Sequence, residues 1–459
     1  MYQITLAQLH QLLGSEVPSQ SRRDICAVTI DSRTAESGMA FLALSGHRCH
    51  GAAFAESAIA NGAECVITDR PVAGSGFNDK VIHVGNSLTA LRTIAQWNRD
   101  QSDAQIWGIT GSVGKTTTRQ MLYAVLETQL TGIQSPANFN NEIGVPLSLI
   151  QLSESSQFGA VELAARHCGE IAELCRQALP HSGIITRIAP CHLESFQSLE
   201  EIRRTKQELA ESLPAEGFLI LNADDPTQAE MANATSADVH WIGTTAPGPG
   251  QFRILSASPA GCRITAGSDV FCYKGGRHLA SAAASAIMAG RLMGLPTPAI
   301  QRGLQNFQPG DGRGKVHVAG GVTIIDESYN ASPASVVAAA ESVADWKPRR
   351  LTLVLGDMLE LGPQTEELQR SCICRLLALK PSHIFFVGRS SQLCRQQAIE
   401  LGCAAGQITA CPTAAAAALP IAQYTDNGDL IWIKGSRLLG LEDIVSHLRH
   451  RADDSREAA

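Results

Sequence analysis

The stretch Thr110-Gly111-Ser112-Val113-Gly114-Lys115-Thr116-Thr117 constrains the fold more than any other part of this 459-residue chain. It follows an apolar run over 105–109, which predicts a strand, and precedes residues 119–130, whose apolar spacing predicts a helix. A glycine-rich turn between a strand and a helix directs backbone N–H groups toward an anion, and the helix dipole adds to the attraction. We therefore predict a P-loop, in which Lys115 reaches the outer phosphates of a nucleotide and the Thr116 hydroxyl binds Mg²⁺.

The glycine placement departs from the usual P-loop pattern. Ile109 occupies the position of the first glycine, and Gly108 lies one place early. The alternative is an ordinary turn that happens to contain Gly-Lys-Thr. We prefer the nucleotide site because the predicted strand, turn and helix all lie where phosphate binding requires them.

Length, charge and cysteine usage narrow the class of protein. A chain of 459 residues is too long for one core, and about three domains are expected. The net charge of −7, with both signs mixed along the chain, argues against nucleic acid or a membrane surface as the main partner. The 13 cysteines are scattered without a C-x-x-C pair, which predicts reduced thiols. No apolar run is long enough to span a bilayer, so we expect a cytoplasmic protein. Nothing in the sequence indicates an obligate subunit interface, so we expect a monomer.

Strands alternate with helices along the chain, which predicts an α/β fold with parallel sheets. We divide it into a small α/β N-terminal domain over 1–100, a central P-loop domain over 104–310 and a Rossmann-like C-terminal domain over 311–459. The polar stretch over 98–103 is the first linker candidate. Residues 236–275 predict a small antiparallel flap.

Three ionisable residues of the central domain are candidates for chemistry. Glu162 ends an apolar strand, where its carboxylate can hold Mg²⁺, although an ion pair with a basic residue is the alternative. His192 follows the strand over 183–186 and can bind a second metal or a phosphate, with a structural histidine equally consistent. Lys206 follows two arginines on a predicted helix, a pattern that favours a solvated basic face.

Polar turns of the C-terminal domain supply further candidates. Asp326 follows a strand and can accept from a ribose hydroxyl, and Asn330 can bind the nucleotide. Arg313 lies at the expected hinge, where it can move onto phosphates when domains close. Lys434 and Arg437 follow the last strand and suit a carboxylate or phosphate of a substrate. A solvated turn is an equal alternative at each of these places.

Together, these features resemble the Mur ligases, the ATP-dependent amide ligases of peptidoglycan synthesis. The similarity covers nearly the whole chain, and within the family it is greatest to the ligases that use D-alanyl-D-alanine. The stretches that carry it are 31–33 with 38–46, 110–117, 138–146, 162–171, 189–194, 326–333 and 434–437.

The resemblance implies a reaction and a set of roles. ATP phosphorylates the terminal carboxylate of UDP-N-acetylmuramoyl-tripeptide, and the amine of D-alanyl-D-alanine attacks the acyl phosphate, giving an amide, ADP and phosphate. It implies that Thr116 and Glu162 bind one Mg²⁺ and His192 the other, and that Lys206 matches a lysine that some members carbamylate.

The resemblance also implies contacts with the nucleotide and the substrates. The residues expected to contact ATP are Thr110, Gly111, Ser112, Val113, Gly114, Lys115, Thr116, Thr117, Arg313, Asp326 and Asn330. Those expected to contact the substrates are Ser32 and Arg33 of a nucleotide-sugar domain, Asn138, Asn140, Asn141, Lys434 and Arg437.

Several positions depart from the family pattern. Leu279 and Ala282 stand where two adenine-binding asparagines are usual, and Ser332 replaces an asparagine. Ala165 and Arg166 stand before His167 where Ala-Asn is usual, so Arg166 replaces the asparagine. One alternative is therefore another Mur-type ligase with a different carboxylate or amine. A nucleotide-dependent switch protein is the other, although a switch would need neither Glu162 nor a third domain.

Overall fold

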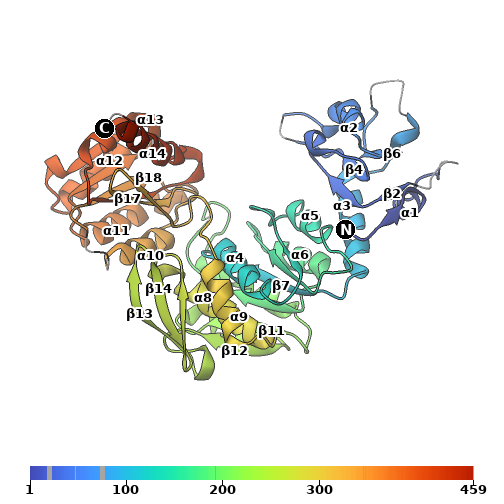
Figure 1. Cartoon of the computed structure of the whole chain (residues 1–459), viewed down its shortest axis with the longest axis horizontal. Helices are drawn as coiled ribbons and strands as arrows, with labels where there is room; N and C mark the ends of the chain where they lie inside the picture. The colour runs from blue at the N-terminus through green and yellow to red at the C-terminus, as the bar shows by residue number, and fades with distance from the viewer. Residues whose placement is uncertain are drawn as a thin grey trace.

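The computed structural model describes residues 1–17, 23–46, 48–72, 78–191, 193–344, 346 and 348–457. Its strands form parallel and mixed sheets with helices between them. Figure 1 shows the N-terminal part (blue) and the C-terminal part (orange to red) at opposite ends of the molecule, with the central part between them. The predicted α/β fold class is confirmed. Among the described residues, no helix is both long and apolar enough to cross a membrane.

The N-terminal part is a four-stranded parallel sheet of order β3-β4-β5-β6, beside a short antiparallel pair, β1 and β2. Its two central strands, β4 and β5, are almost fully buried, as strands with both faces covered must be, whereas β3 is half-buried. The strands are β1 (Ile4–Thr5), β2 (Asp24–Ile25), β3 (Ala27–Thr29), β4 (Met39–Leu42), β5 (Cys65–Thr68) and β6 (Val81–His83), and the helices are α1 (Leu6–Leu12), α2 (Ala55–Ala60) and α3 (Ser87–Asp100).

The connection to the central part is a buried joint. Helix α3 runs through the first half of the polar stretch over 98–103, and its last turn carries the buried side chains of Asn98 and Arg99. The Asn98 amide donates to three carbonyl oxygens within residues 149–152, at the end of a neighbouring helix. The Arg99 guanidinium donates to the carbonyl oxygens of Ala178 and Ser102. The polar stretch does connect the two parts, but its first half is helical and carries buried side chains, because Asn98 and Arg99 satisfy main-chain groups at helix ends.

The central part is a six-stranded parallel sheet of order β12-β11-β10-β7-β9-β8. Its neighbouring strands β7 and β9 end in the P-loop and in Glu162, so both lie at the carboxyl edge where α/β sheets bind ligands. The elements are β7 (Gln105–Thr110), α4 (Lys115–Leu126), β8 (Gly132–Gln134), α5 (Gly144–Leu149), β9 (Phe158–Glu162), α6 (Glu170–Ala178), β10 (Ser182–Ile185), α7 (Leu199–Glu211), β11 (Phe218–Asn222) and β12 (Asp238–Ile242).

An antiparallel flap and two helices complete the central part. The flap, predicted over 236–275, consists of β13 (Phe252–Ser258), β14 (Gly261–Ala266) and β15 (Asp269–Tyr273), while β12 joins the main sheet. Helices α8 (Ala280–Leu292) and α9 (Thr297–Asn306) pack against α4. The approach is close, since a Cβ added at Gly290 would lie 2.9 Å from a Val125 methyl group.

The C-terminal part is a six-stranded sheet of order β16-β17-β21-β18-β19-β20, in which only β16 is antiparallel to its neighbour. Its strands are β16 (Lys315–Ala319), β17 (Val322–Glu327), β18 (Leu351–Gly356), β19 (His383–Val387), β20 (Ile408–Cys411) and β21 (Leu430–Lys434). Its helices are α10 (Pro333–Ala344), α11 (Thr365–Leu377), α12 (Ser391–Glu400), α13 (Ala414–Tyr424) and α14 (Glu442–Glu457).

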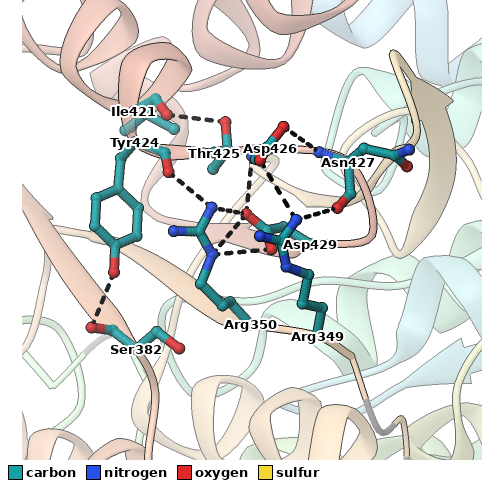
Figure 2. Close-up of polar contacts among 9 residues, drawn as sticks. All are labelled: Arg349, Arg350, Ser382, Ile421, Tyr424, Thr425, Asp426, Asn427 and Asp429. Atoms are coloured by element: carbon teal, nitrogen blue, oxygen red, sulfur yellow. Dashed lines mark hydrogen bonds and ion pairs between the residues drawn. The ribbon is translucent and has the colours of Figure 1, made fainter.

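A charged network fixes the start of two of these strands (Figure 2). Asp429, which is 1% exposed, accepts from the Arg350 Nε at 3.0 Å, and Arg349 donates to the Asn427 carbonyl oxygen at 2.9 Å. The network joins the first residues of β18 and β21, and it sets their register. Lys434 lies at the opposite, carboxyl end of β21, so its height in the sheet depends on this anchor.

Candidate active site

The predicted P-loop has the expected strand, turn and helix, with the helix α4 beginning at Lys115 rather than 119. Gly111 and Gly114 adopt φ values of 138° and 93°, which glycine alone tolerates readily. A Cβ at Gly111 would also collide with the Thr186 hydroxyl. The Lys115 ammonium donates to the Gly111 carbonyl oxygen at 2.8 Å, across the turn. The turn therefore leaves the first N–H groups of a 12-residue helix at the mouth of the site.

The structure brings Thr116 and Glu162 together. Glu162 is 2% exposed, and its Oε2 accepts from the Thr116 hydroxyl at 2.8 Å. Its Oε1 accepts from the Asn140 amide at 2.8 Å, so a third candidate lies at the same carboxylate. A hydroxyl and a carboxylate are oxygen ligands of the kind that Mg²⁺ prefers, and the pair fits that ion.

Arg119 was missed by the sequence analysis. It lies one helical turn after Lys115 and is 2% exposed. Its Nε lies 3.6 Å from Oε2 of Glu162, and its Nη1 donates to the Ser135 carbonyl oxygen. Arg119 stands among the polar residues in the first half of α4, so no local pattern distinguished its buried side chain.

Lys206 is buried, which contradicts the predicted solvated basic face. The side chain on α7 is 2% exposed, and its Nζ lies 3.3 Å from the Ala165 carbonyl oxygen and 5.6 Å from the centre of the Phe196 ring. Burial, together with the nearby Lys115 ammonium, lowers the pKa of Lys206 to about 7. Local charge patterning failed here because Lys206 faces the sheet while its arginine neighbours pair with Glu200 at the surface. His192 lies outside the described residues.

A cleft of about 920 Å³ lies between the central and C-terminal parts and is lined by residues of both. The candidates that line it are Ser112, Val113, Gly114, Lys115, Thr116, Thr117, Asn138, Asn140, Asn141, Glu162, Arg313, Asn330 and Lys434. Of the positions that depart from the family pattern, Arg166, Leu279 and Ser332 also line it, whereas Ala282 is 8% exposed within α8. Arg166 forms an ion pair with Glu360 of the C-terminal part at 3.3 Å.

The C-terminal candidates have partners within their own domain. The Arg313 guanidinium lies 3.7 Å from the centre of the Tyr329 ring, and that of Arg437 lies 5.5 Å from the same ring. Asp326 is 5% exposed and accepts from the Gly312 N–H at 3.1 Å and from the Ser328 hydroxyl at 2.6 Å. Asp326 therefore stabilises the turn that precedes Arg313. The sequence analysis expected Asp326 to contact a ribose hydroxyl and did not predict this structural role.

Two further cleft residues, His278 and Glu327, were not candidates. Lys434 places its Nζ 2.9 Å from Oε2 of Glu327 and 3.1 Å from the Asn330 carbonyl oxygen. His278, which precedes α8, places its Nε2 3.4 Å from Oε1 of Glu327. Asp326 and Glu327 are adjacent acids at the end of the predicted strand, and this pattern could have identified Glu327 as a candidate. The sequence analysis selected only Asp326.

The N-terminal candidates lie in their own turn, away from this cleft. Asp31 accepts from the Arg33 N–H at 3.0 Å, and its carboxylate forms an ion pair with the Arg33 side chain at 2.6 Å. These hydrogen bonds lower the pKa of Asp31 to about 2. The Arg33 guanidinium is exposed and Ser32 is buried behind it. The turn therefore presents a cation at the surface of the N-terminal sheet.

Sequence families match all three parts of the chain. They are described as the Mur ligase family catalytic domain, over 24–97, the Mur ligase middle domain, over 109–278, and the Mur ligase glutamate ligase domain, over 312–437. Together they span most of the sequence, in the order of the three parts described above.

Full-length relatives are also similar. The UDP-N-acetylmuramoyl-tripeptide–D-alanyl-D-alanine ligase of Bacillus subtilis (strain 168) is 32% identical over 438 residues, which are 94% of each chain. The enzyme of that name from Escherichia coli (strain K12) is 30% identical over 457 residues, which are 98% of this chain and 99% of the relative.

Solved structures show the same arrangement. The crystal structure of MurF from Acinetobacter baumannii superposes with a TM-score of 0.85 at 28% identity, covering 98% of this chain and 99% of that one. The MurF ligase from Thermotoga maritima in complex with ADP gives a TM-score of 0.79 at 24% identity, covering 94% and 98%, and supports the fold.

Proposed function

Since this chain belongs to the Mur ligase family, we propose that it joins D-alanyl-D-alanine to UDP-N-acetylmuramoyl-tripeptide in an ATP-dependent reaction. The products are the pentapeptide precursor, ADP and phosphate. The relatives named UDP-N-acetylmuramoyl-tripeptide–D-alanyl-D-alanine ligase align with almost the full chain. The observation that carries the proposal is the Thr116–Glu162 pair, which lies in one cleft with Lys115, Arg313 and Lys434. The cleft thus gathers phosphate-binding groups from two domains, as transfer between a nucleotide and a second substrate requires.

We propose that the nucleotide phosphates lie on the N–H groups at the start of α4, with the Lys115 ammonium on the outer phosphates. Thr116 and Glu162 would hold Mg²⁺, and the bound ion would neutralise charge on the phosphoryl group. Asn140 orients Glu162 through its amide, and His192 is proposed for a second ion. The Tyr329 ring holds Arg313 at the cleft wall, and on nucleotide binding the guanidinium would move from the ring to a phosphate.

The tripeptide carboxylate attacks the terminal phosphorus of ATP, and the bond from that phosphorus to the ADP oxygen breaks. The amine of D-alanyl-D-alanine then attacks the acyl carbon, phosphate leaves, and the amine proton passes to solvent. Lys434 and Arg437 are proposed to bind the anionic groups of these substrates, and Asn138 and Asn141 the peptide. Ser32 and Arg33 of the domain over 1–100 are proposed to bind the UDP sugar.

Lys206 is proposed to act as a carbamate. Its pKa of about 7 leaves a neutral amine at physiological pH, which can form an N–C bond with carbon dioxide and release a proton to solvent. The added anion would lie near the Lys115 cation and could serve the second metal ion. We further propose that the enzyme acts in the cytoplasm as a monomer, because residues of a single chain line the cleft.

The test is phosphate release from ATP and Mg²⁺ with UDP-N-acetylmuramoyl-tripeptide, with and without D-alanyl-D-alanine. Release that requires both substrates, with the pentapeptide detected by mass, would support the proposal. Release without either substrate would favour a nucleotide-dependent switch. Release that responds to another carboxylate or amine would indicate a Mur-type ligase with different substrates.

A further inference from the structure

A buried charged network joins the central and C-terminal parts at one wall of the cleft. Glu327 and Lys434 end the neighbouring parallel strands β17 and β21, in register with each other, and each is 5% exposed. The Lys434 Nζ lies 2.9 Å from Oε2 of Glu327. His278 comes from the other side of the interface and places its Nε2 3.4 Å from Oε1 of the same carboxylate. One carboxylate therefore contacts an ammonium of its own sheet and an imidazole of the central part.

The Lys434 ammonium has three N–H donors. One donates to Glu327 and one to the Asn330 carbonyl oxygen at 3.1 Å. Because Lys434 also lines the cleft, its remaining donor is available to an anionic group bound there. Both protein partners of Lys434 belong to the C-terminal part, and one of them, Glu327, is also the residue that His278 of the central part contacts.

The imidazole of His278 is the contact that Glu327 makes with the central part, in addition to Lys434 and the Trp432 indole of its own sheet. Oε1 of Glu327 is buried and has no hydrogen-bond partner at the usual distance, an arrangement that is costly for a carboxylate. Burial lowers the pKa of His278, which favours the neutral ring. Nδ1 of His278 lies 2.7 Å from the Ser342 hydroxyl, so the tautomer that serves both neighbours accepts from Ser342 and directs Nε2–H at Glu327.

The direction of the Lys434 ammonium depends on this contact. With His278 absent, both oxygens of Glu327 would be open to Lys434, and the stronger charge-assisted pairing would draw the ammonium away from the cleft. With His278 in place, one oxygen is occupied and Lys434 keeps a donor toward the bound anion. Docking of the central part onto the C-terminal part would thus control where the Lys434 charge points.

We propose that Glu327 and His278 are positioning residues, which hold Lys434 toward the transferred phosphoryl group when the central and C-terminal domains are docked. The proposal rests on the function proposed above, because the phosphoryl group is that of the acyl phosphate. Lys434 touches the reacting group, whereas Glu327 and His278 act through it.

A double-mutant cycle tests the link between Glu327 and Lys434. Glu327→Gln, Lys434→Met and the double variant are compared with wild type in the full chain by phosphate release with both substrates. We expect each single variant to lower kcat about 100-fold. The KM for ATP should change by less than about threefold, and the double variant should be no slower than Lys434→Met. Exposed Glu341→Gln on α10 is the matched control and should retain wild-type kcat.

The His278 contact has its own pair of variants. His278→Gln keeps an N–H donor within reach of Glu327 and should lose about threefold in kcat, whereas His278→Leu should lose about tenfold or more. A purely structural role would lower the melting temperature of both variants without separating their kcat values. If Glu327→Gln fails to fold, the His278 pair alone decides the proposal.

Independent, additive effects of Glu327→Gln and Lys434→Met in an active enzyme would overturn the inference and leave the proposed function intact. Equal kcat values for His278→Gln and His278→Leu would do the same. A wild-type protein that releases no phosphate from ATP when both UDP-N-acetylmuramoyl-tripeptide and D-alanyl-D-alanine are present would overturn both proposals.

Discussion

The Thr116 hydroxyl lies 2.8 Å from the Glu162 carboxylate, although the two residues are 46 positions apart in the chain. Parallel pairing of β7 with β9 produces this contact, because Ile109 is in register with Glu162 and the P-loop follows directly. The contact places the only acidic group of β9 at the start of α4, where the phosphates are proposed to bind. It also gives Glu162 a nearby cation, Arg119, at 3.6 Å.

Glu162→Gln tests the proposed metal ligand. The amide can keep the hydrogen bonds to Thr116 and Asn140 but removes the negative charge that favours Mg²⁺. We expect the rate of phosphate release to fall about 100-fold, as for loss of a group that stabilises transferred charge. The Mg²⁺ concentration for half-maximal rate should rise as well. Exposed Glu154→Gln is the control, and an unchanged Mg²⁺ response in Glu162→Gln would remove Glu162 from the metal site.

The two P-loop glycines should differ in their response to alanine. Gly111→Ala meets both a positive φ and a collision with the Thr186 hydroxyl, whereas Gly114→Ala meets a positive φ with its nearest neighbour, the Thr186 Cβ, at 4.0 Å. We expect Gly114→Ala to cost about 1 kcal/mol of stability and Gly111→Ala about 2 kcal/mol or more. Urea unfolding measures both values. ATP affinity, measured by calorimetry, should fall further for Gly111→Ala, and equal behaviour of the two variants would contradict this geometry.

Asn98→Ala tests the joint between the N-terminal and central parts. The substitution leaves three buried carbonyl oxygens without the amide donor, and loss of such a partner costs about 1–3 kcal/mol. We expect a lower melting temperature and an earlier, separate transition of the N-terminal part in calorimetry. Gln101→Ala, just past the same helix, should leave the melting curve unchanged. A single transition at the wild-type temperature in Asn98→Ala would show that the joint does not depend on this amide.

The sequence predicted those features that depend on local pattern. Alternating strands and helices gave the α/β class, and the Gly-Lys-Thr turn gave the P-loop, because backbone geometry and side-chain chemistry lie within a few residues of each other. Pairs that form across the sheets were not predictable in this way. The contact between His278 and Glu327 requires two domains to dock, and no spacing in a single sequence encodes that distance.

Burial was the second feature that local pattern could not predict. Arg203, Arg204 and Lys206 lie close together on one charged helix, yet the two arginines pair with Glu200 whereas Lys206 is 2% exposed and has no acidic ion-pair partner within the described residues. Burial of Asn98 and Arg99 was also not predicted, because a run of polar residues suggested a linker whereas the structure has a buried joint there. In each case the partners are main-chain carbonyl oxygens, which every sequence contains and no motif reveals.

The lowered pKa of Lys206 predicts a pH dependence of the free energy of unfolding that can be measured without an activity assay. Its pKa falls from 10.5 to about 7 in the folded protein, so between these values the unfolded chain binds a proton that the folded chain does not. Stability from this group therefore rises with pH through that window, and the penalty of the buried charge is fully present below about pH 7.

Lys206→Met should remove this dependence. We expect the variant to be more stable than wild type at pH 6.5, by on the order of 1 kcal/mol for each pKa unit of the shift, with the difference shrinking steadily toward pH 9.5. Urea unfolding at a series of pH values measures it, with exposed Lys274→Met as the control. Bicarbonate should stabilise wild type but not Lys206→Met if the neutral amine takes up carbon dioxide. A stability difference that does not change with pH would mean that Lys206 titrates normally in the folded protein.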